Sequence, residues 1–568
     1  MANQKIPGFS FANRDGGLRP TVLVPTTERL LIIGNALDGP VNSPIFVRDL
    51  TSAEKIFGPL TYTGDYVNPQ TSTADGAYAD NNLLKALSEA LLGGGGNVIC
   101  VRVGGTTAAV TGIFTTSIDA YGRSPGRVYN NVSLTAATGA LGSITITLTQ
   151  PSSKGSTLTW SFAAGSTLGN VVQAINNDTR NGSVLLTIPV ANVSDAISVI
   201  AAGTVTLSDT VVGTNGTGAA GEDYSGNKSG YYTELTKQYG TFDTLLTTEF
   251  NVAVLAGIYA DDQVDDTIAA TTTTVAQDFA NFLYSVSKEV QPCCGVIGLR
   301  PTGLKSPAEL TTYALTSLLN TTDGYYNQTA RWLNFGYFMN AGFYYTDPDD
   351  GSLVDVGRYI SVIAGPDLIM TGQSEIGYYL ENGAAIYAGM ITSLPAQSAT
   401  TNKALGTIKL MNGNFTKSIH EQLNQGIGRD DSTGAFGSAA YVTFKTNNTI
   451  NRPVVVADNT CSQRDSDYRT LQVLRIANLA HTVTKQVMYP FIGEPSSVEA
   501  KTAMRTQLNS ALQRLVDAGA LLGGDGNGFK FTISSDPVET LLGQITITLF
   551  LRPALQIKYV KVVVNLTA

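Results

Sequence analysis

The end of the chain carries the feature that most restricts how the molecule can fold. Residues 556–566 read QIKYVKVVVNL, a run rich in β-branched residues that strongly favours an extended strand. Pro553 separates this run from the strand-like segment 543–551, because proline cannot donate a hydrogen bond to a β-ladder. A strand left unpaired promotes aggregation, so we predict that residues 554–568 form a C-terminal arm that pairs with a second chain.

The opposite end of the chain has a shorter segment of the same kind. Residues 1–27 contain Pro7, Pro20 and Pro25 and lack helical periodicity, which predicts an extended arm. Residues 21–24 lie between two of these prolines and are β-prone. The predicted intersubunit strands comprise Thr21, Val22, Leu23, Val24, Gln556, Ile557, Lys558, Tyr559, Val560, Lys561, Val562, Val563 and Val564.

The body between the arms begins with alternating strand and helix patterns. Short apolar runs predict buried strands, and apolar residues at helical spacing predict the helices between them. The predicted elements are strands at 29–34, 98–103, 251–255 and 294–299 and helices at 82–92 and 268–288. Strands that alternate with helices indicate one α/β domain, which we assign to residues 28–134 and 208–330.

Residues 135–207 interrupt this pattern. Apolar residues alternate with polar ones at 144–148 and again at 158–162, which is typical of half-buried strands. An amphipathic helix is predicted at 168–175. We therefore predict a small β-rich domain inserted into the α/β domain.

Residues 331–553 form the last predicted domain. A helix at 471–488 and a second helix, with a capping box at Ser496 and Glu499, each carry an apolar stripe. The predicted stripes are Val473, Ile476, Ala480, Val483 and Val487 in the first helix and Met504, Leu508, Ala511 and Leu515 in the second. A half-buried antiparallel pair of strands is predicted after them, so the whole chain is predicted to be an α+β multidomain protein.

Composition argues against several classes of partner. Only 14% of the residues are charged, and the formal net charge of −9 does not favour binding to nucleic acid. No apolar run approaches 18 residues, and the first residues lack the pattern of a signal peptide. We expect no direct insertion into a membrane.

Residues that could carry chemistry are few, and they form no recognisable motif. The four cysteines lack metal-ligand spacing, and the chain has only two histidines. The acidic residues at 347–350 lack the ligand spacing of a calcium loop, which favours a solvated hairpin turn. Neither a nucleophile elbow nor a phosphate-binding loop is present. We therefore expect no catalytic residue, no cofactor and no metal site.

Several segments resemble, in order along the chain, the contractile-tail sheath proteins of bacteriophages. They are LIIGNALDGP at 31–40, PIFVRDLTSAEKIFGPL at 44–60, GGGGNVICVRV at 93–103, GRVYNNVSL at 126–134 and YYTELTKQYG at 231–240. The most specific part is FIGEP at 491–495 with the helices and strands around it, which resembles the C-terminal α/β domain of these sheaths.

The resemblance implies a structural, nonenzymatic protein of the virion tail, assembled in the cytoplasm of a bacterial host. Such sheaths form stacked hexameric rings around a tail tube and shorten when the baseplate triggers them. The implied partners are further copies of the chain, the tail tube protein, and the baseplate and tail terminator proteins. In this family the terminal arms are exchanged between neighbouring subunits. As a weaker hypothesis, Lys501 and Arg505, one turn apart beside the apolar stripe, face an acidic tube.

Two alternatives remain open at this point. The sheath of a headless contractile injection system is structurally equivalent, and a neighbouring capsid or portal gene would distinguish the two. A secreted β-rich adhesin or hydrolase would require export and a polar site, for which the sequence gives no sign.

Overall fold

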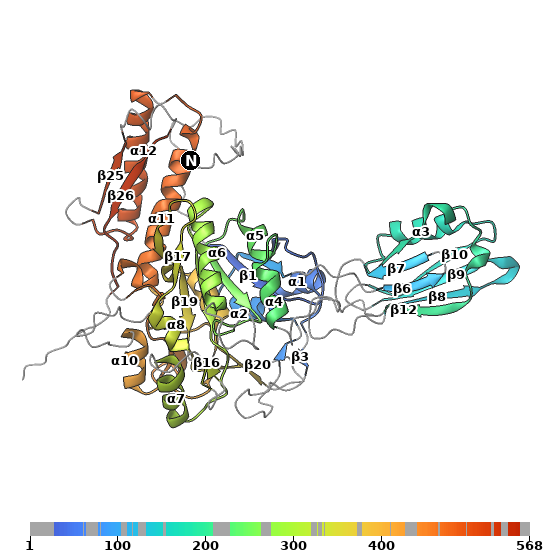
Figure 1. Cartoon of the computed structure of the whole chain (residues 1–568), viewed down its shortest axis with the longest axis horizontal. Coiled ribbons are helices and arrows are strands. Elements are labelled where there is room, and N and C mark those ends of the chain that lie inside the picture. The colour runs from blue at the N-terminus through green and yellow to red at the C-terminus, as the bar shows by residue number, and fades with distance from the viewer. Residues whose placement is uncertain are drawn as a thin grey trace, which may run out of the picture.

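The computed structural model describes most of the chain between residues 28 and 556 (Figure 1). The described residues are 28–60, 62–63, 78–79, 81–103, 111–115, 118–122, 132–150, 155–207, 228–262, 274–319, 326–327, 332–333, 335–371, 378–408, 410–425, 440–463, 466–495, 497–523, 528–534 and 544–556. The predicted arm strands at 21–24 and 557–564 lie outside these ranges and stay predictions. Gln556 is described, and it is not part of a strand.

A six-stranded sheet forms the centre of the molecule, and five of its strands are parallel. Its order is β19 (Ile360–Ile363), β14 (Cys294–Gly298), β13 (Val252–Ala256), β1 (Leu30–Gly34), β5 (Val98–Arg102) and β2 (Ile45–Val47). Only β2 is antiparallel to its neighbour. Every residue of β1, β5, β13 and β14 is buried, because a parallel sheet is covered on both faces.

Helices cover both faces of this sheet. The helices on one face are α1 (Leu50–Phe57), α2 (Asn82–Gly93) and α9 (Ala384–Ser393), and those on the other are α4 (Lys228–Thr236), α5 (Thr241–Leu245) and α6 (Val275–Glu289). Alternate residues of β1 divide between the two cores: Leu30 and Ile32 pack with α2 and α9, whereas Leu31 and Ile33 pack with α6.

The contact between α2 and α9 is unusually close. A Cβ atom placed on Gly389 would lie 2.1 Å from the carbonyl oxygen of Ala90. A Cβ atom on Gly93 would lie 2.2 Å from the carbonyl oxygen of Ile386. Both distances are far below van der Waals contact, so the two helices touch backbone to backbone and glycine is required at both positions.

Smaller elements surround the central sheet. They are β3 (Tyr62–Thr63) with β4 (Tyr78–Ala79), β15 (Tyr326–Asn327) with β16 (Trp332–Leu333), β17 (Tyr344–Thr346) with β18 (Leu353–Asp355), β20 (Leu368–Thr371) with β21 (Tyr378–Glu381) and β22 (Leu410–Met411), β23 (Phe444–Asn447) with β24 (Arg452–Val455), and the helices α7 (Pro307–Tyr313), α8 (Phe335–Ala341) and α10 (Lys417–Gln425).

The predicted solvated hairpin turn lies between β17 and β18, where residues 348–352 are exposed, but Asp347 at its start is buried. Asp347 is only 3% exposed, and its Oδ2 atom lies 2.6 Å from Lys288 Nζ on α6. Lys288 also reaches Asp349 at 2.6 Å, and this pairing holds the hairpin against the helix. The lysine holds the pKa of the Asp347 carboxyl at about 2, so the turn carries an internal ion pair.

A second unit projects from the body beyond the central sheet (Figure 1). It contains a four-stranded sheet in the order β10 (Leu158–Phe162), β9 (Ile144–Thr149), β8 (Ser133–Thr138) and β12 (Gly203–Thr206). A three-stranded sheet in the order β11 (Val184–Thr187), β7 (Ile118–Gly122) and β6 (Thr111–Thr115) and the helix α3 (Leu168–Asn177) complete the unit. Its separate core includes Ile118, Ala120, Val132 and Leu134, which precede the predicted domain start at residue 135. The unit is thus larger at its beginning than the alternation of residues suggests.

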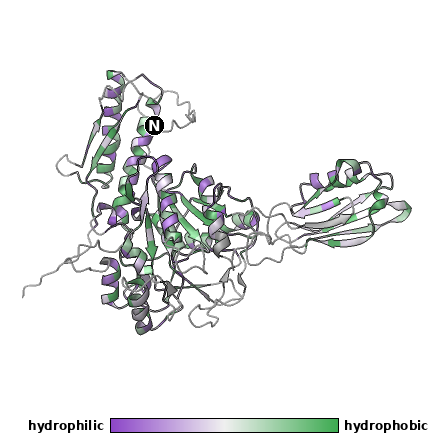
Figure 2. Ribbon diagram, in the orientation of Figure 1, coloured by the Kyte–Doolittle hydropathy of each residue, from purple (hydrophilic) through white to green (hydrophobic). Residues whose placement is uncertain are grey.

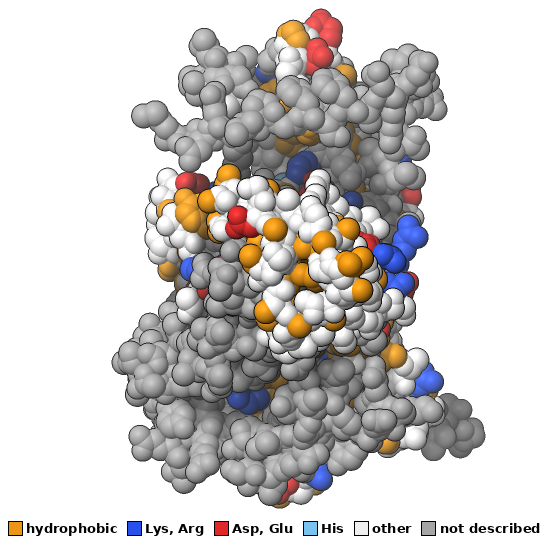
Figure 3. Space-filling model, turned by 90° about the vertical axis from the view of Figure 1, so that its right-hand side faces the viewer, with side chains coloured by type: hydrophobic (Ala, Val, Ile, Leu, Met, Phe, Trp, Pro, Cys, Tyr) orange, Lys and Arg blue, Asp and Glu red, His pale blue; other side chains and the backbone are white. Residues whose placement is uncertain are grey.

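The outer face of its four-stranded sheet is built of hydroxyl side chains. Thr159, Thr147, Thr135 and Thr204 follow one another across the four strands. The hydroxyls of Thr135 and Thr204 are 2.9 Å apart, and those of Thr147 and Thr159 are 3.4 Å apart. Charged side chains are sparse on the part of this unit that faces the viewer in Figure 3.

A third unit contains α11 (Leu471–Met488), α12 (Val498–Asp517), β25 (Phe529–Ile533) and β26 (Ile547–Leu551). The two predicted apolar stripes are confirmed, since all nine of their residues are buried. The cap of α12 is Ser497, whose side chain accepts from the amide of Ala500, rather than the predicted Ser496. In Figure 2 the strands of the central sheet and the inner sides of these helices are the most hydrophobic parts.

The predicted division at residue 331 is crossed by the central sheet, because β19 comes from the later segment. All four cysteines are free and buried. Within the described ranges, no helix has both the length and the apolar character needed to span a membrane.

Candidate assembly interface

The strand pair β25 and β26 is open at both edges. The two strands pair antiparallel from Phe529 opposite Leu551 to Ile533 opposite Ile547. Among the residues that the structure describes, neither strand has a second neighbour. Each outer edge therefore presents backbone N–H and C=O groups to which a further strand could bind.

The covered face of this strand pair is only partly buried. Five apolar residues pack against the core of α11 and α12 without being fully buried: Phe529, Phe531, Ile547, Leu549 and Leu551. On the other face, Phe550 is 56% exposed. A two-stranded sheet is too narrow to cover two long helices, and strands added at its edges would bury more of these side chains.

The chain leaves this unit toward its C-terminal end along α11. Beyond β26, the amide of Ala554 donates to the carbonyl oxygen of Ala520 at 2.9 Å. The carbonyl oxygen of Ala554 accepts from Gln472 Nε2 on α11 at 3.1 Å. Gln556 donates to the buried Asp458 carboxylate at 2.5 Å. The partners Ala520, Gln472 and Asp458 thus hold residues 554–556, where the predicted C-terminal arm begins.

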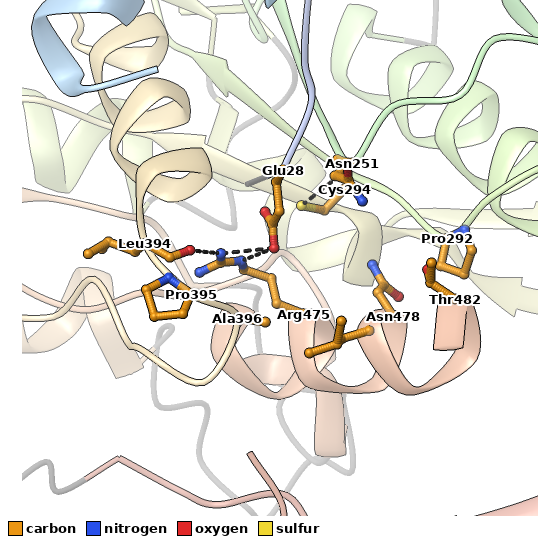
Figure 4. A pocket seen from close by; sticks show the side chains of 11 residues that line it. Glu28, Asn251, Pro292, Cys294, Leu394, Pro395, Ala396, Arg475, Asn478 and Thr482 are labelled. Atoms are coloured by element: carbon orange, nitrogen blue, oxygen red, sulfur yellow. Dashed lines mark hydrogen bonds and ion pairs between the residues drawn. The ribbon is translucent and has the colours of Figure 1, made fainter. Parts of the chain in front are cut away.

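The first described residue at the other end is held by the same helix. Arg475 Nη2 lies 2.9 Å from Glu28 Oε1, and Nε of the same side chain lies 3.3 Å from it. Figure 4 shows this pair in a pocket between α11 and the beginnings of β13 and β14, where Asn251 and Cys294 lie. The described part of the chain therefore begins in this pocket, directly after the predicted N-terminal arm.

The segment 391–397, which contains the end of α9 and the turn after it, contacts both α11 side chains that hold Glu28 and Ala554. Arg475 donates to the carbonyl oxygens of Ile391 at 2.9 Å and Leu394 at 2.6 Å. Gln472, three residues earlier on the same helix face, donates to the carbonyl oxygen of Gln397 at 2.7 Å. The segment from 391 to 397 is thus fastened to α11 by the same two side chains that hold Glu28 and Ala554.

Sequence reasoning missed both of these α11 residues. Arg475 is 3% exposed and Gln472 is 4% exposed, although both are polar. The available signal is their position within LQVLRIA, where two polar side chains interrupt an apolar run at a spacing of three. Their partners lie far away in sequence, so only the folded chain identifies them.

The predicted tube-facing residues lie on α12, near the open sheet. Arg505 is exposed and Lys501 is partly buried. They lie one helical turn apart, beside the buried Met504 and Leu508, as the sequence predicts. Whether they contact a tube stays a prediction.

A second pocket contains the most unusual titratable group. Glu89 is buried and accepts a 3.0 Å hydrogen bond from the Tyr379 hydroxyl. Burial, with the nearby Glu381 carboxylate, raises the pKa of Glu89 to about 8. Lys85 pairs with Glu381 and lies 5.3 Å from the centre of the Tyr379 ring. These groups satisfy one another, and we assign them a structural role.

The described part of the chain contains no group of three or more His, Cys, Asp or Glu side chains that could hold a metal ion. His420 is buried on α10, with its Nδ1 atom 3.0 Å from the Thr443 hydroxyl. Burial lowers the pKa of His420 to about 4. The histidine therefore packs as a neutral side chain.

Comparison with protein-family models finds no match for the sequence, and comparison with curated proteins finds none either. Solved structures do match. A sheath tail protein from Desulfitobacterium hafniense has a TM-score of 0.51 and 11% identity, covering 96% of this chain and 100% of that one. A sheath tail protein from Listeria innocua has a TM-score of 0.49 and 10% identity, covering 93% and 95%.

The contracted sheath of an extracellular contractile injection system, called PVC, has a TM-score of 0.47 and 10% identity, covering 99% of this chain and 98% of that one. The structural neighbours are thus sheaths of tails and of injection systems. We draw on the first match only, because the other two TM-scores lie below 0.5. That match shows the fold: over almost its whole length, the chain folds like a sheath tail protein.

Proposed function

We propose that the protein is the subunit of a contractile tail sheath. In this proposal it polymerises as stacked hexameric rings around a tail tube, and the stack shortens to drive the tube through the host envelope. The proposed partners are further copies of the chain, the tube protein, and the baseplate and tail terminator proteins. The role is structural, with no catalytic step. The fold shared with a sheath tail protein supports it.

The observation that carries the proposal is the unfinished strand pair β25 and β26. Its two edges are open within the described residues, and its inner face is incompletely covered. The C-terminal segment that follows has high β-propensity and departs close to this sheet. Each main-chain hydrogen bond that a neighbour's strand makes contributes about 1 kcal/mol, so several bonds at every contact of a lattice would hold the rings together.

The inserted unit supports the same arrangement. It projects away from the body and from the C-terminal unit (Figure 1). We place it on the outer surface of the sheath, where it interferes with neither ring contacts nor the tube. A density map of the assembled tube checks this placement directly.

The decisive experiment removes residues 557–568 and keeps the contacts of Ala554 and Gln556. The full chain should form hollow cylinders by electron microscopy, whereas the truncated chain should remain a monomer with an unchanged melting temperature. A matched control replaces 557–568 with a glycine and serine tail of the same length, and it too should fail to assemble. Normal cylinders from either variant would refute the role of this strand.

The sheath of a headless injection system would have the same architecture. The presence of capsid and portal genes beside the gene for this chain supports the phage tail, and their absence supports the headless system.

A further inference from the structure

The side chain of Arg475 is a charged group in a nearly dry site. It is 3% exposed, and its carboxylate partner Glu28 has a side chain that is 18% exposed. The remaining guanidinium contacts go to the backbone carbonyls of Ile391 and Leu394. If Glu28 is withdrawn, a buried positive charge loses its carboxylate partner, which is strongly unfavourable. Turning toward water would relieve this cost, and it would break the hydrogen bonds of Arg475 to the two carbonyls.

Loss of these hydrogen bonds affects the other end of the chain. Ile391 lies in the last turn of α9 and Leu394 caps that helix, and the turn that follows contains Gln397, whose carbonyl oxygen accepts from Gln472. Gln472 in turn holds the carbonyl of Ala554. The path from Glu28 to Ala554 therefore runs through hydrogen bonds and one short turn, with no mobile linker between them.

Further charges lie close to this path. The buried Asp458 accepts from Gln556 and from Thr401. Burial lowers the pKa of Lys403, and the Arg475 charge lowers it further. The Asp458 charge acts on the same lysine and raises its pKa, so Arg475 and Asp458, which holds the last described residue, lie in one group of interacting charges.

We propose that Arg475 and Gln472 are positioning residues that couple the two ends of the chain, so that withdrawal of Glu28 loosens residues 554–556. The biological role of this coupling rests on the proposed function: capture of one arm by a neighbouring subunit makes the second arm easier to capture. Growth of the lattice is then cooperative within each subunit. The coupling itself is a property of the monomer and is tested there.

Two readouts in the full chain report the two ends separately. Cys294 lines the pocket beside Glu28 and is 1% exposed, so the rate at which a thiol reagent labels it reports opening at the N-terminal departure point. Mass spectrometry distinguishes it from the other buried cysteines. Amide hydrogen exchange over 554–556 reports the C-terminal departure point, where the Ala554 amide is hydrogen-bonded.

The first variant is Glu28→Ala. It should speed labelling of Cys294 and raise amide exchange at 554–556 by about fivefold or more, the lower range of typical coupling between sites. Glu28→Gln, which keeps a hydrogen-bond acceptor, should give a smaller change. Glu249→Ala is the matched control, because Glu249 is an exposed partner of the neighbouring Arg29 and should change neither readout.

The second variant tests the reverse direction. Since coupling is reciprocal, Gln472→Ala should speed labelling of Cys294 although Gln472 lies at the other departure point. The inference is overturned if Glu28→Ala speeds labelling of Cys294 and leaves exchange at 554–556 unchanged, or if Gln472→Ala leaves Cys294 labelling unchanged. A full chain that never forms cylinders would instead refute the sheath function, whatever these monomer readouts show.

Discussion

The central sheet and the C-terminal strand pair are both built from strands rich in apolar residues, but the central strands are fully buried and the strand pair is not. Strand β1 is buried along its whole length, with neighbours on both sides and helices on both faces. Strand β26 has one neighbour among the described residues and alternates between partly buried and exposed residues. The first arrangement is complete within one chain, whereas in our proposal the second is completed by a strand from another subunit. The difference then separates the part that keeps its shape from the part that we propose binds neighbours.

The variant with the largest expected effect on stability alters the contact between α2 and α9 in the body. Gly389→Ala places a Cβ atom 2.1 Å from the Ala90 carbonyl oxygen and must separate α2 from α9. We expect a loss of about 3 kcal/mol or more in the free energy of unfolding, measured by denaturant titration. Local helix propensity alone predicts the opposite sign, since alanine favours a helix by about 1 kcal/mol.

Gly96→Ala is the control for that variant. A Cβ atom at Gly96 would meet nothing within 4 Å, so its stability should change by no more than about 0.5 kcal/mol. Equal effects of the two substitutions would show that the close helix contact does not constrain the body.

The second test uses pH, because the chain has one histidine in each region. His420 is 7% exposed in the body, whereas His481 is exposed on α11. Burial and the Lys445 charge lower the pKa of His420 from 6.5 to about 4. Its unfolded form therefore binds a proton first, and the stability that neutral His420 contributes is present above pH 6.5 and is lost as the pH falls toward 4.

The expected loss from this one group is up to about 3 kcal/mol over that pH range. It is measured as the difference between the parent and His420→Gln in unfolding experiments from pH 7 to pH 4. Burial and the Lys485 charge also lower the pKa of His481, so His481→Gln should change the pH dependence in the same direction, but by less than His420→Gln because His481 is exposed. If His481→Gln changed the pH dependence of stability more than His420→Gln, the acid sensitivity would lie in the C-terminal unit and not in the body.

The smallest expected effect on stability comes from α12. Replacing Lys501 and Arg505 with glutamate should change the free energy of unfolding by about 0.5 kcal/mol or less, because neither side chain is fully buried. Acidic residues near the beginning of a helix are also tolerated well. The same double variant should lose binding to the tube protein in co-sedimentation. Retained binding would remove these two residues from the proposed tube-facing surface.

Much of the fold could be predicted from the sequence because local patterns determine it. Continuous apolar runs identify β1, β5, β13 and β14, which are buried on both faces. Stripes at helical spacing identify the inner faces of α11 and α12. Here local propensity and tertiary packing favour the same structure, so the sequence pattern is sufficient.

The remaining features depend on contacts between distant residues. Glu28 and Arg475 are 447 positions apart, and no local pattern links them. The inserted unit starts before the predicted residue 135 because the strands Thr111–Thr115 and Ile118–Gly122 belong to it, and the glycine in each strand weakens the alternation of apolar and polar residues. The burial of Asp347 was missed because its partner Lys288 lies on another element. In each case the residues that determine the feature become neighbours only in the folded chain.

The close contact of α2 and α9 also limits how this sequence can change over time. Where backbones touch at Gly93 and Gly389, no single substitution can be accommodated by moving a neighbouring side chain. An altered spacing would require simultaneous changes on both helices, a route that stepwise mutation rarely follows. Sequences that share this body should therefore keep the smallest residue at these two positions, whatever changes elsewhere.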